Sequence, residues 1–237
     1  MARTYNQECI LAHALDLLGE RWTFLIIRDL FLGPQRFGDL QATLPGIGAN
    51  LLSKRLKELT EAGLIEAPDA TGPNNRYRLT EYGEGLRPTI RNLMRWSVHY
   101  FKTRTQTSPA KACIYSDDLM PDTVALAIEL FSDDVRDESL NYVAHAYIDD
   151  YPYTLFYMNG QMTARRGVDA PAVACLSGSV ADLMKALRYD IDTEEARRRL
   201  KLEGDPRATE HLLKCISHLE HQQVEALDVH EHRIATS

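Results

Sequence analysis

Residues 47–65 read IGANLLSKRLKELTEAGLI and combine three features in one short segment. A helix over this segment places Leu52, Leu56 and Leu59 on one stripe, because residues four and seven apart share a helix face. Gly63 is typical of a helix end, and the apolar residues after it predict a strand. The segment therefore predicts a helix that is buried on one side and is followed directly by a strand.

Another face of the same predicted helix carries polar and basic side chains. Asn50, Ser53, Lys54 and Lys57 fall at positions i, i+3, i+4 and i+7. These side chains can donate hydrogen bonds to phosphates, and Asn, Ser and Lys can also contact base edges in a DNA groove. A charged helix face is more commonly just a solvated surface. The helix by itself therefore leaves both interpretations open.

The neighbouring segments favour nucleic-acid binding. Periodicity predicts helices over 9–19, 21–33 and 36–44, the helix described above, strands over 64–68 and 76–80, and a long helix over 81–103. The tight turn before the fourth helix gives the arrangement of a helix-turn-helix, and the two strands form a hairpin beside it. Thr80 is placed to cap the long helix.

This order assigns roles to seven residues. The helix of the opening segment is expected to enter the major groove of double-stranded DNA, where Asn50 and Ser53 contact bases. The residues expected to contact phosphates are Lys54, Arg55, Lys57, Arg76 and Arg78.

Residues 9 to about 100 resemble the HxlR family of winged helix-turn-helix transcription regulators. The matching segments are CILAHALDLLGERWTFLIIRDLFLGPQRFGDLQATLPGIGANLLSKRLKELTEAGLIE and YRLTEYGEGLRP. The resemblance implies a homodimer, in which the first helix and the long helix build the interface and two recognition helices contact two half-sites. The interface candidates are Leu11, Leu15, Leu93, Trp96 and Tyr100. Those in the long helix fit a domain core equally well.

Cys9 occupies the place where some members of this family carry an oxidant-sensing cysteine. A sensing role requires an exposed thiol with a lowered pKa, and the neighbouring Glu8 opposes formation of the thiolate. The alternative role for Cys9 is that of a small apolar residue at the dimer seam.

Charge is unevenly distributed along the chain. Fourteen basic and eleven acidic residues lie up to Arg104, whereas thirteen basic and twenty-three acidic residues follow it. Together with the polar stretch KTRTQTSPAK (102–111), this contrast predicts two domains with different partners. The expected organisation is a DNA-binding and dimerisation domain at 1–104, a linker at 105–111, a second domain at 112–220 and a tail at 221–237. Chance and an acidic tail are the alternative explanation of the contrast.

The second half predicts an α+β domain with an antiparallel sheet, so that the fold class of the whole chain is α+β. Asn159-Gly160 lies between two alternating runs and indicates a hairpin with a type I′ turn. Residues 120–218 resemble the sterol carrier protein type 2 fold, on the segments SGSVADLMKAL, DTEEA and LKLEGDP. The resemblance implies an apolar tunnel that accepts a hydrophobic small molecule.

Candidate residues for such a pocket are the larger apolar side chains of this half. They are Phe131, Tyr142, Phe156, Met158, Met162, Leu183, Met184 and Leu187. Aromatic and Met side chains commonly form an ordinary core, which is the alternative.

The sequence carries no catalytic motif, metal-binding pattern or cofactor-binding motif, so we expect no enzyme. Four cysteines without a CxxC pair and the lack of a membrane-spanning run or signal peptide favour a cytoplasmic protein. We expect a homodimeric regulator, most simply a repressor, whose second domain binds an apolar molecule. The rivals are a hydrophobic-ligand carrier that uses the winged helix only for dimerisation, and a regulator whose second domain is structural.

Overall fold

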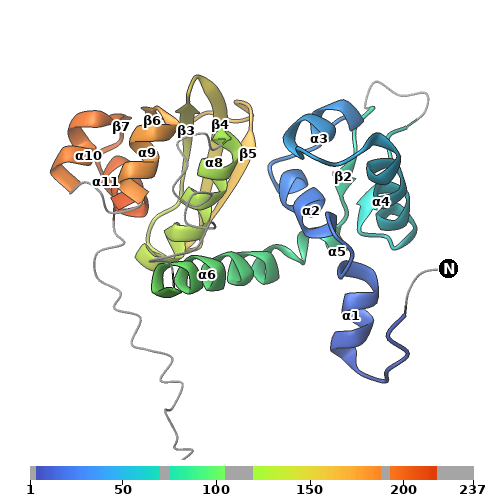
Figure 1. Ribbon diagram of the computed structural model, residues 1–237. Helices are drawn as coiled ribbons and strands as arrows, with labels where there is room; N and C mark the ends of the chain where they lie inside the picture. Colours follow the sequence, from blue (N-terminus) through green and yellow to red (C-terminus); the bar gives the residue numbers. More distant parts are fainter. Residues whose placement is uncertain (1–3, 70–74, 105–119, 188–192, 218–237) are drawn as a thin grey trace, which may run out of the picture. The chain divides into compact units, whose positions relative to one another are not determined.

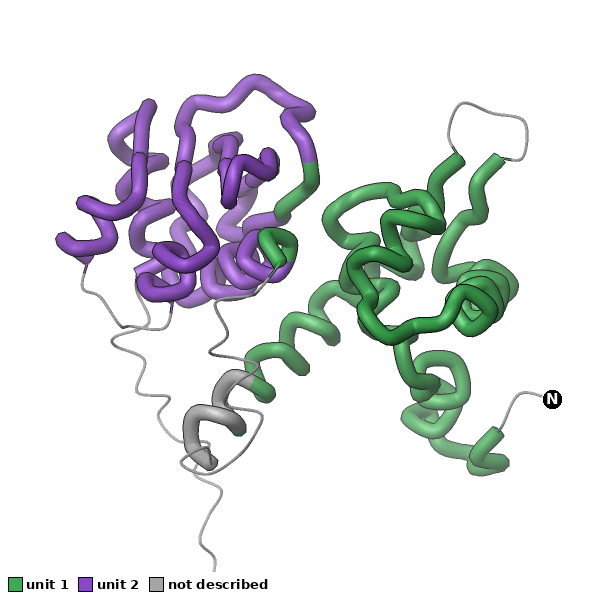
Figure 2. Tube along the Cα trace, turned by 45° about the horizontal axis from the view of Figure 1, so that its top comes forward, with its two compact units in different colours: residues 1–122, 164–166 green, residues 123–163, 167–237 purple. Residues whose placement is uncertain are grey.

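The computed structural model describes residues 4–69, 75–104, 120–187 and 193–217. Its chain divides into two compact units (Figure 2). Unit 1 comprises Met1–Asp122 and Ala164–Arg166, and unit 2 comprises Thr123–Thr163 and Gly167–Ser237. The predicted linker and tail lie outside the described residues, so the predicted domain boundary stays a prediction. Every helix within the described ranges is too short or too polar to cross a membrane.

Unit 1 follows the predicted order of elements (Figure 1). Its elements are α1 (Ile10–Leu18), α2 (Thr23–Phe31), α3 (Phe37–Thr43), α4 (Ala49–Glu61), β1 (Ile65–Glu66), β2 (Arg78–Leu79), α5 (Glu81–Glu84) and α6 (Arg87–Arg104). The predicted stripe on α4 is confirmed, because Leu52, Leu56 and Leu59 are all buried. These leucines belong to the core of this unit and fix which face of α4 remains exposed.

The long helix predicted after the hairpin is instead two helices, α5 and α6. Pro88 explains the break, because it has no amide hydrogen to donate to Glu84 and its ring would clash with the Glu84 carbonyl in a continuous helix. Within α5, a Cβ on Gly83 would lie 2.1 Å from the carbonyl oxygen of Leu64, so α5 packs very closely against the start of the hairpin. The chain then turns at Gly85 before α6 begins. The predicted cap is confirmed, since the Thr80 hydroxyl accepts a hydrogen bond from the Gly83 amide at 3.1 Å.

The hairpin after α4 is short and is joined by a third segment. β1 and β2 are antiparallel, with Ile65 opposite Leu79. Gln35, between α2 and α3, pairs with Tyr77 through two backbone hydrogen bonds of 3.0 and 2.7 Å. The hairpin is thus attached to the loop that precedes α3, which places Arg76 and Arg78 near that loop.

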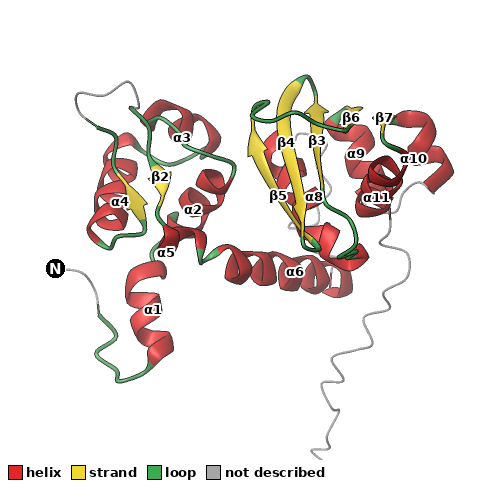
Figure 3. Cartoon of the chain, turned by 180° about the vertical axis from the view of Figure 1, so that it is seen from behind, coloured by secondary structure: helices red, strands yellow, loops and turns green. Residues whose placement is uncertain are grey.

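Unit 2 combines a five-stranded sheet with helices (Figure 3). Its elements are α8 (Pro121–Phe131), the 3-10 helix η1 (Ser132–Val135), β3 (Tyr142–Ile148), β4 (Tyr151–Met158), β5 (Gln161–Arg166), β6 (Ala174–Gly178), α9 (Val180–Leu187), α10 (Thr193–Arg199), β7 (Lys201–Gly204) and α11 (Pro206–Ser217). The first two residues of α8 and the last three of β5 are assigned to unit 1. The strand order is β5-β4-β3-β6-β7. The prediction of an α+β arrangement is confirmed.

The prediction of a wholly antiparallel sheet is wrong. β3 and β6 run parallel, with Ala144 opposite Ala174 and Ile148 opposite Gly178. The hydrophobic alternation of a strand reports which residues face the core, but it contains nothing about the direction of the neighbouring strand. β6 therefore enters the sheet between β3 and β7 rather than at the edge beyond β5.

Two tight turns connect the first three strands of this sheet. Asn159 and Gly160 both have positive φ, 53° and 75°, as the predicted type I′ turn requires. The turn between β3 and β4 is built in the same way from Asp149 and Asp150, with φ of 47° and 66°. Asp tolerates this region better than most residues, which explains a second hairpin turn without glycine.

A buried polar cluster joins the sheet to α11. Tyr142 and Tyr157 are stacked, with ring centroids 5.3 Å apart, and the Tyr142 hydroxyl lies 2.8 Å from Nδ1 of His211. Nε2 of His211 lies 3.0 Å from the carbonyl oxygen of Val135, which can only accept, so Nε2 carries the proton and Nδ1 accepts from Tyr142. Burial lowers the pKa of His211 and raises the pKa of Tyr142. The cluster is therefore neutral and places polar groups inside an apolar interior.

Candidate nucleic-acid interface

The exposed face of α4 presents the predicted polar residues together. Asn50, Ser53, Lys54 and Lys57 are all exposed. Nζ of Lys54 lies 3.8 Å from Glu58, and Nζ of Lys57 lies 3.7 Å from Glu61. Pairs this exposed contribute little free energy, so both cations can exchange a carboxylate for a phosphate at small cost.

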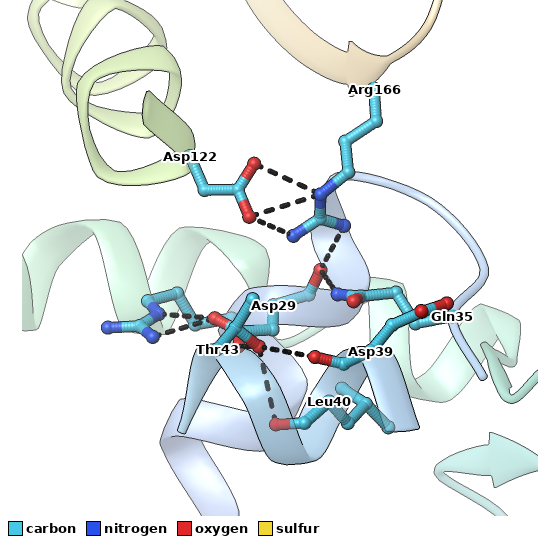
Figure 4. Close-up of polar contacts among 8 residues, drawn as sticks. Asp29, Gln35, Asp39, Leu40, Thr43, Asp122 and Arg166 are labelled. Carbon is cyan, nitrogen blue, oxygen red and sulfur yellow. Dashed lines mark hydrogen bonds and ion pairs between the residues drawn. The ribbon is translucent and has the colours of Figure 1, made fainter. Parts of the chain in front are cut away.

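The helix before α4 is fixed to α2 by a buried carboxylate (Figure 4). Asp29 is 2% exposed and accepts a hydrogen bond of 2.6 Å from the Thr43 hydroxyl at the end of α3. Its other oxygen accepts from Nε of Arg28 at 2.9 Å. The Gln35 side chain adds a bond of 3.0 Å to the Asp29 carbonyl. These contacts orient α3, and the short turn that follows then fixes where α4 begins.

The predicted tight turn between α3 and α4 contains Pro45 and Gly46. Gly46 has φ of 93°, a conformation that L side chains rarely adopt. Ile47 is buried, and its amide donates to the Leu44 carbonyl at 3.2 Å. Ile47 thus anchors the turn in the core, while Ala49 and Asn50 at the start of α4 remain exposed.

A groove lies at the base of the hairpin, beside the loop that precedes α3. Its lining residues are Pro34, Arg36, Glu66, Ala67, Asp69, Arg76 and Arg78. Arg78 forms an ion pair with Glu66, and Nη1 of Arg76 donates to the Pro34 carbonyl at 3.3 Å. Arg76 and Arg78 are exposed, as the expected phosphate contacts must be. Residues 70–74, between the two strands in sequence, lie outside the described residues.

Arg36 is a basic residue of this groove that the sequence analysis did not single out. It is exposed and immediately precedes α3, and its amide donates to the Asp39 carboxylate at 3.0 Å. The attachment of Gln35 to Tyr77 brings Arg36 beside the hairpin. Its place as the first residue of the predicted helix 36–44 was the available signal. The pairing of Gln35 with Tyr77, which brings Arg36 beside the hairpin, is not readable from the sequence.

The structure does not support the expectation that Arg55 contacts phosphates. Its side chain is buried, with the residue 8% exposed. Nη2 donates to Glu20 at 2.6 Å, and Nη1 donates to Glu58. Arg55 lies between the leucine stripe and the polar face of α4, and the two carboxylates hold it toward the body of unit 1. We therefore leave Arg55 out of the proposed phosphate contacts.

Large apolar side chains are exposed on α1 and α6. Leu11 is 66% exposed and Trp96 is 58% exposed, and Leu93 and Tyr100 are also exposed. Trp96 stacks on Tyr100 with centroids 5.1 Å apart. Leu15 is half-buried. Leu93, Trp96 and Tyr100 thus lie on the surface of the single chain, and their role in an interface stays a prediction.

The predicted pocket residues divide between the two faces of the sheet. Tyr142, Met162, Leu183, Met184 and Leu187 are buried, and Phe131 is half-buried. Phe156 is half-buried, and Met158 is 42% exposed. Both flank Tyr157, whose side chain faces His211. Because successive side chains of a strand alternate, Phe156 and Met158 project to the opposite face. They cannot line one cavity with Tyr142.

Cys9 is exposed and is a free thiol immediately before α1. The other free cysteines of the described residues, Cys175 and Cys215, are half-buried and buried in unit 2. Burial raises the pKa of the Cys215 thiol, which keeps it protonated and unreactive.

Comparisons with known proteins agree with the architecture of unit 1. A family model described as HxlR-like helix-turn-helix matches residues 17–105. The uncharacterized HTH-type transcriptional regulator Rv3095 of Mycobacterium tuberculosis is 45% identical over 100 residues, which cover 41% of this chain and 62% of that protein. This chain thus matches less than two thirds of the mycobacterial relative's length.

A second relative is matched over most of its length. The HTH-type transcriptional regulator YodB of Bacillus subtilis is 37% identical over 89 residues, which cover 37% of this chain and 80% of YodB. The crystal structure of quinone-bound YodB shares 35% identity, with a TM-score of 0.35, over 38% of this chain and 98% of that one. By its match to the family model and to YodB, the chain belongs to the HxlR-like helix-turn-helix family.

Proposed function

We propose that this protein is a homodimeric, DNA-binding transcription regulator whose two α4 helices enter the major groove at two half-sites of an operator. The observation that carries the proposal is the exposed face of α4, where Asn50, Ser53, Lys54 and Lys57 lie together on the helix that directly precedes the hairpin. A dimer bound across an operator excludes other proteins from that DNA, and we infer that it represses transcription.

The proposed roles follow from the chemistry of each side chain. Lys54 and Lys57 are point charges that bind phosphates, and Arg76 and Arg78 extend the basic surface along the hairpin. Asn50 and Ser53 combine donor and acceptor groups, which can distinguish base edges in the major groove. Arg36 joins the phosphate contacts, because it lies in the same groove as Arg76 and Arg78.

The apolar side chains on α1 and α6 support a homodimer. An exposed set that includes Leu11, Leu93 and Trp96 is unusual for a monomer and is typical of an interface. A two-fold dimer presents the same surface from both chains and spaces two recognition helices at a fixed distance. The exposed apolar residues therefore fit the requirement for two half-sites.

Replacing Lys54 by alanine tests the assignment of α4. One lost phosphate contact per α4 should lower affinity roughly three- to tenfold for all sequences and should reduce the salt slope by ~0.9 per contact. The measurement is the dissociation constant for DNA from upstream of the protein's own coding sequence, at several salt concentrations. Lys214→Ala is a matched control, because Lys214 is an exposed lysine on α11 of unit 2.

An unchanged affinity and slope for Lys54→Ala would refute the assignment of α4 as the recognition helix. Wild-type protein that shows no salt-dependent DNA binding would refute the proposed function as a whole. It would favour the hydrophobic-ligand carrier, in which the helix-turn-helix serves only to dimerise.

We further propose that unit 2 resembles the sterol carrier protein type 2 fold and binds a hydrophobic small molecule that modulates DNA binding. The support is an apolar interior with a few polar groups, namely Tyr142, Tyr157 and His211, a combination common in ligand sites. Met162 and Met184 are also buried in unit 2, and methionine side chains can repack around a ligand. Modulation requires that the ligand bind the DNA-competent and incompetent states with different affinities.

Native mass spectrometry of gently purified protein tests this role. We expect a dimer that carries a co-purified apolar mass, and DNA binding that changes when organic extraction removes it. Leu183→Arg, which places a charge in the proposed site, should lose the bound mass. An apo dimer whose DNA binding responds to none of a panel of fatty acids, sterols and aromatic compounds would instead make unit 2 a structural element.

A further inference from the structure

The connection between α1 and α2 contacts α4 and the turn before it. Oε2 of Glu20, in this connection, accepts a hydrogen bond of 2.6 Å from Nη2 of Arg55 in α4. The Trp22 ring lies against the turn before α4: a Cβ added to Gly46 would be 3.7 Å from Cη2 of Trp22. Residues 19–22 therefore link the helix proposed for dimerisation to the helix proposed for DNA recognition.

The connection itself has little freedom. A Cβ on Gly19 would lie 2.5 Å from the backbone oxygen of Leu15, so the chain leaves α1 along a path that only glycine allows. Trp22 adopts φ of 81°, which for a bulky residue is a strained conformation that the surrounding structure must impose. The guanidinium of Arg21 lies over the Trp22 ring, 5.1 Å from its centroid. Because this connection has few alternative conformations, a shift of α1 should shift α4 as well.

Arg55 depends on two carboxylates for its charge balance. It is buried between Glu20 and Glu58, and its Nε is a buried donor without a hydrogen-bond partner. Glu58 also lies 3.8 Å from Nζ of Lys54, so a row of alternating charges runs from the connection to the exposed face of α4. Removing Glu20 leaves a buried guanidinium only half compensated, and α4 must shift to hydrate it.

We propose that Glu20 and Arg55 position α4 relative to α1 and thereby set the distance between the two recognition helices of the dimer. This inference rests on the proposed function. Arg55 is in this view a positioning residue that never touches DNA, and Glu20 acts on DNA binding only through Arg55. The pair favours one spacing of the two half-sites over others.

Glu20→Gln separates positioning from simple electrostatics. Removing an acidic residue from a DNA-binding unit should strengthen its attraction to a polyanion, or leave it unchanged. A positioning role of Glu20 predicts the reverse. Affinity for the binding site mapped by footprinting in the DNA upstream of the protein's own coding sequence should fall roughly five- to tenfold, and the salt slope should not change. Glu61→Gln is the matched control, because Glu61 is an exposed acid on α4 that pairs with Lys57 and not with Arg55. It should bind DNA at least as tightly as the wild type.

The spacing of the half-sites provides a second readout, which a loss of stability alone would not change. The test uses duplexes with one or two base pairs inserted or deleted between the half-sites. The loss of affinity caused by the altered spacing should be smaller for Glu20→Gln than for the wild type. A double-mutant cycle with Arg55→Met should show that Glu20→Gln has no further effect once Arg55 is absent. If Arg55→Met does not fold, the comparison of Glu20→Gln with Glu61→Gln still tests the positioning role of Glu20.

Three results would overturn the positioning role. They are unchanged or tighter binding by Glu20→Gln, an equal loss at every half-site spacing, and a salt slope that falls by ~0.9 in Arg55→Met, as expected for a lost phosphate contact. Wild-type protein without salt-dependent DNA binding would instead remove the proposed function itself. The two failures are therefore distinguishable.

Discussion

Replacing Trp96 by glutamate should convert the dimer to a monomer and reduce affinity for a two-half-site operator by at least about a hundredfold. Trp96 is 58% exposed in the single chain and stacks on Tyr100 within the proposed interface. Tryptophan commonly contributes much of the binding free energy at protein interfaces, and a glutamate carboxylate buried there has no compensating charge. Sedimentation equilibrium measures the state of assembly, and titration of the operator measures the affinity.

Tyr151→Glu is the matched control for this variant. Tyr151 is an aromatic residue of similar exposure, 61%, but it lies at the start of β4 in unit 2. It should remain a dimer with wild-type affinity. If Trp96→Glu also stayed dimeric, the two chains would have to meet elsewhere, and α6 would lose its proposed role.

Leu56→Ala should destabilise unit 1 by about 2–5 kcal/mol, the usual cost of truncating a buried leucine. Leu56 is 1% exposed and lies between Leu52 and Leu59 on the buried stripe of α4. Domains are typically stable by only about 5–15 kcal/mol, so this loss should leave part of the protein unfolded at 37 °C and weaken DNA binding. The measurement is unfolding in urea at 25 °C.

Tryptophan fluorescence makes this experiment specific for unit 1. The chain contains two tryptophans, Trp22 and Trp96, and both belong to that unit. Leu51→Ala serves as control, because Leu51 is on the same helix but only half-buried, and its truncation should cost clearly less. Equal losses for the two variants would contradict the division of α4 into a buried and an exposed face.

The sequence predicted most of unit 1 because its signals are local. The leucine stripe of α4, the glycine at position 63 and the Thr80 cap each depend on residues within one or two helical turns. The break between α5 and α6 escaped this approach. Its local signal, Pro88, was outweighed by the helical periodicity over 81–103. The close packing of α5 was not readable at all, because it depends on Gly83 meeting the Leu64 carbonyl, nineteen positions away.

The proposed site shows the same division between local and distant information. Lys54 and Lys57 are exposed as predicted, because their position on the helix decides it. Arg55 lies one residue away, but its partner Glu20 is separated by thirty-five positions, and no periodicity reveals such a pair. In unit 2, alternation identified β4, yet which face Met158 occupies follows from the register with β3, which only the folded chain defines.

The parallel pairing of β3 with β6 has a consequence for synthesis of the protein. The β3–β4–β5 meander is complete once Arg166 has left the ribosome, whereas β6 begins only at Ala174. Until then one edge of β3 carries unpaired N–H and C=O groups beside the apolar side chains of Ala144, Ala146 and Ile148. Such an edge is a template for another chain. The nascent protein is thus most open to aggregation in the short interval before β6 closes that edge.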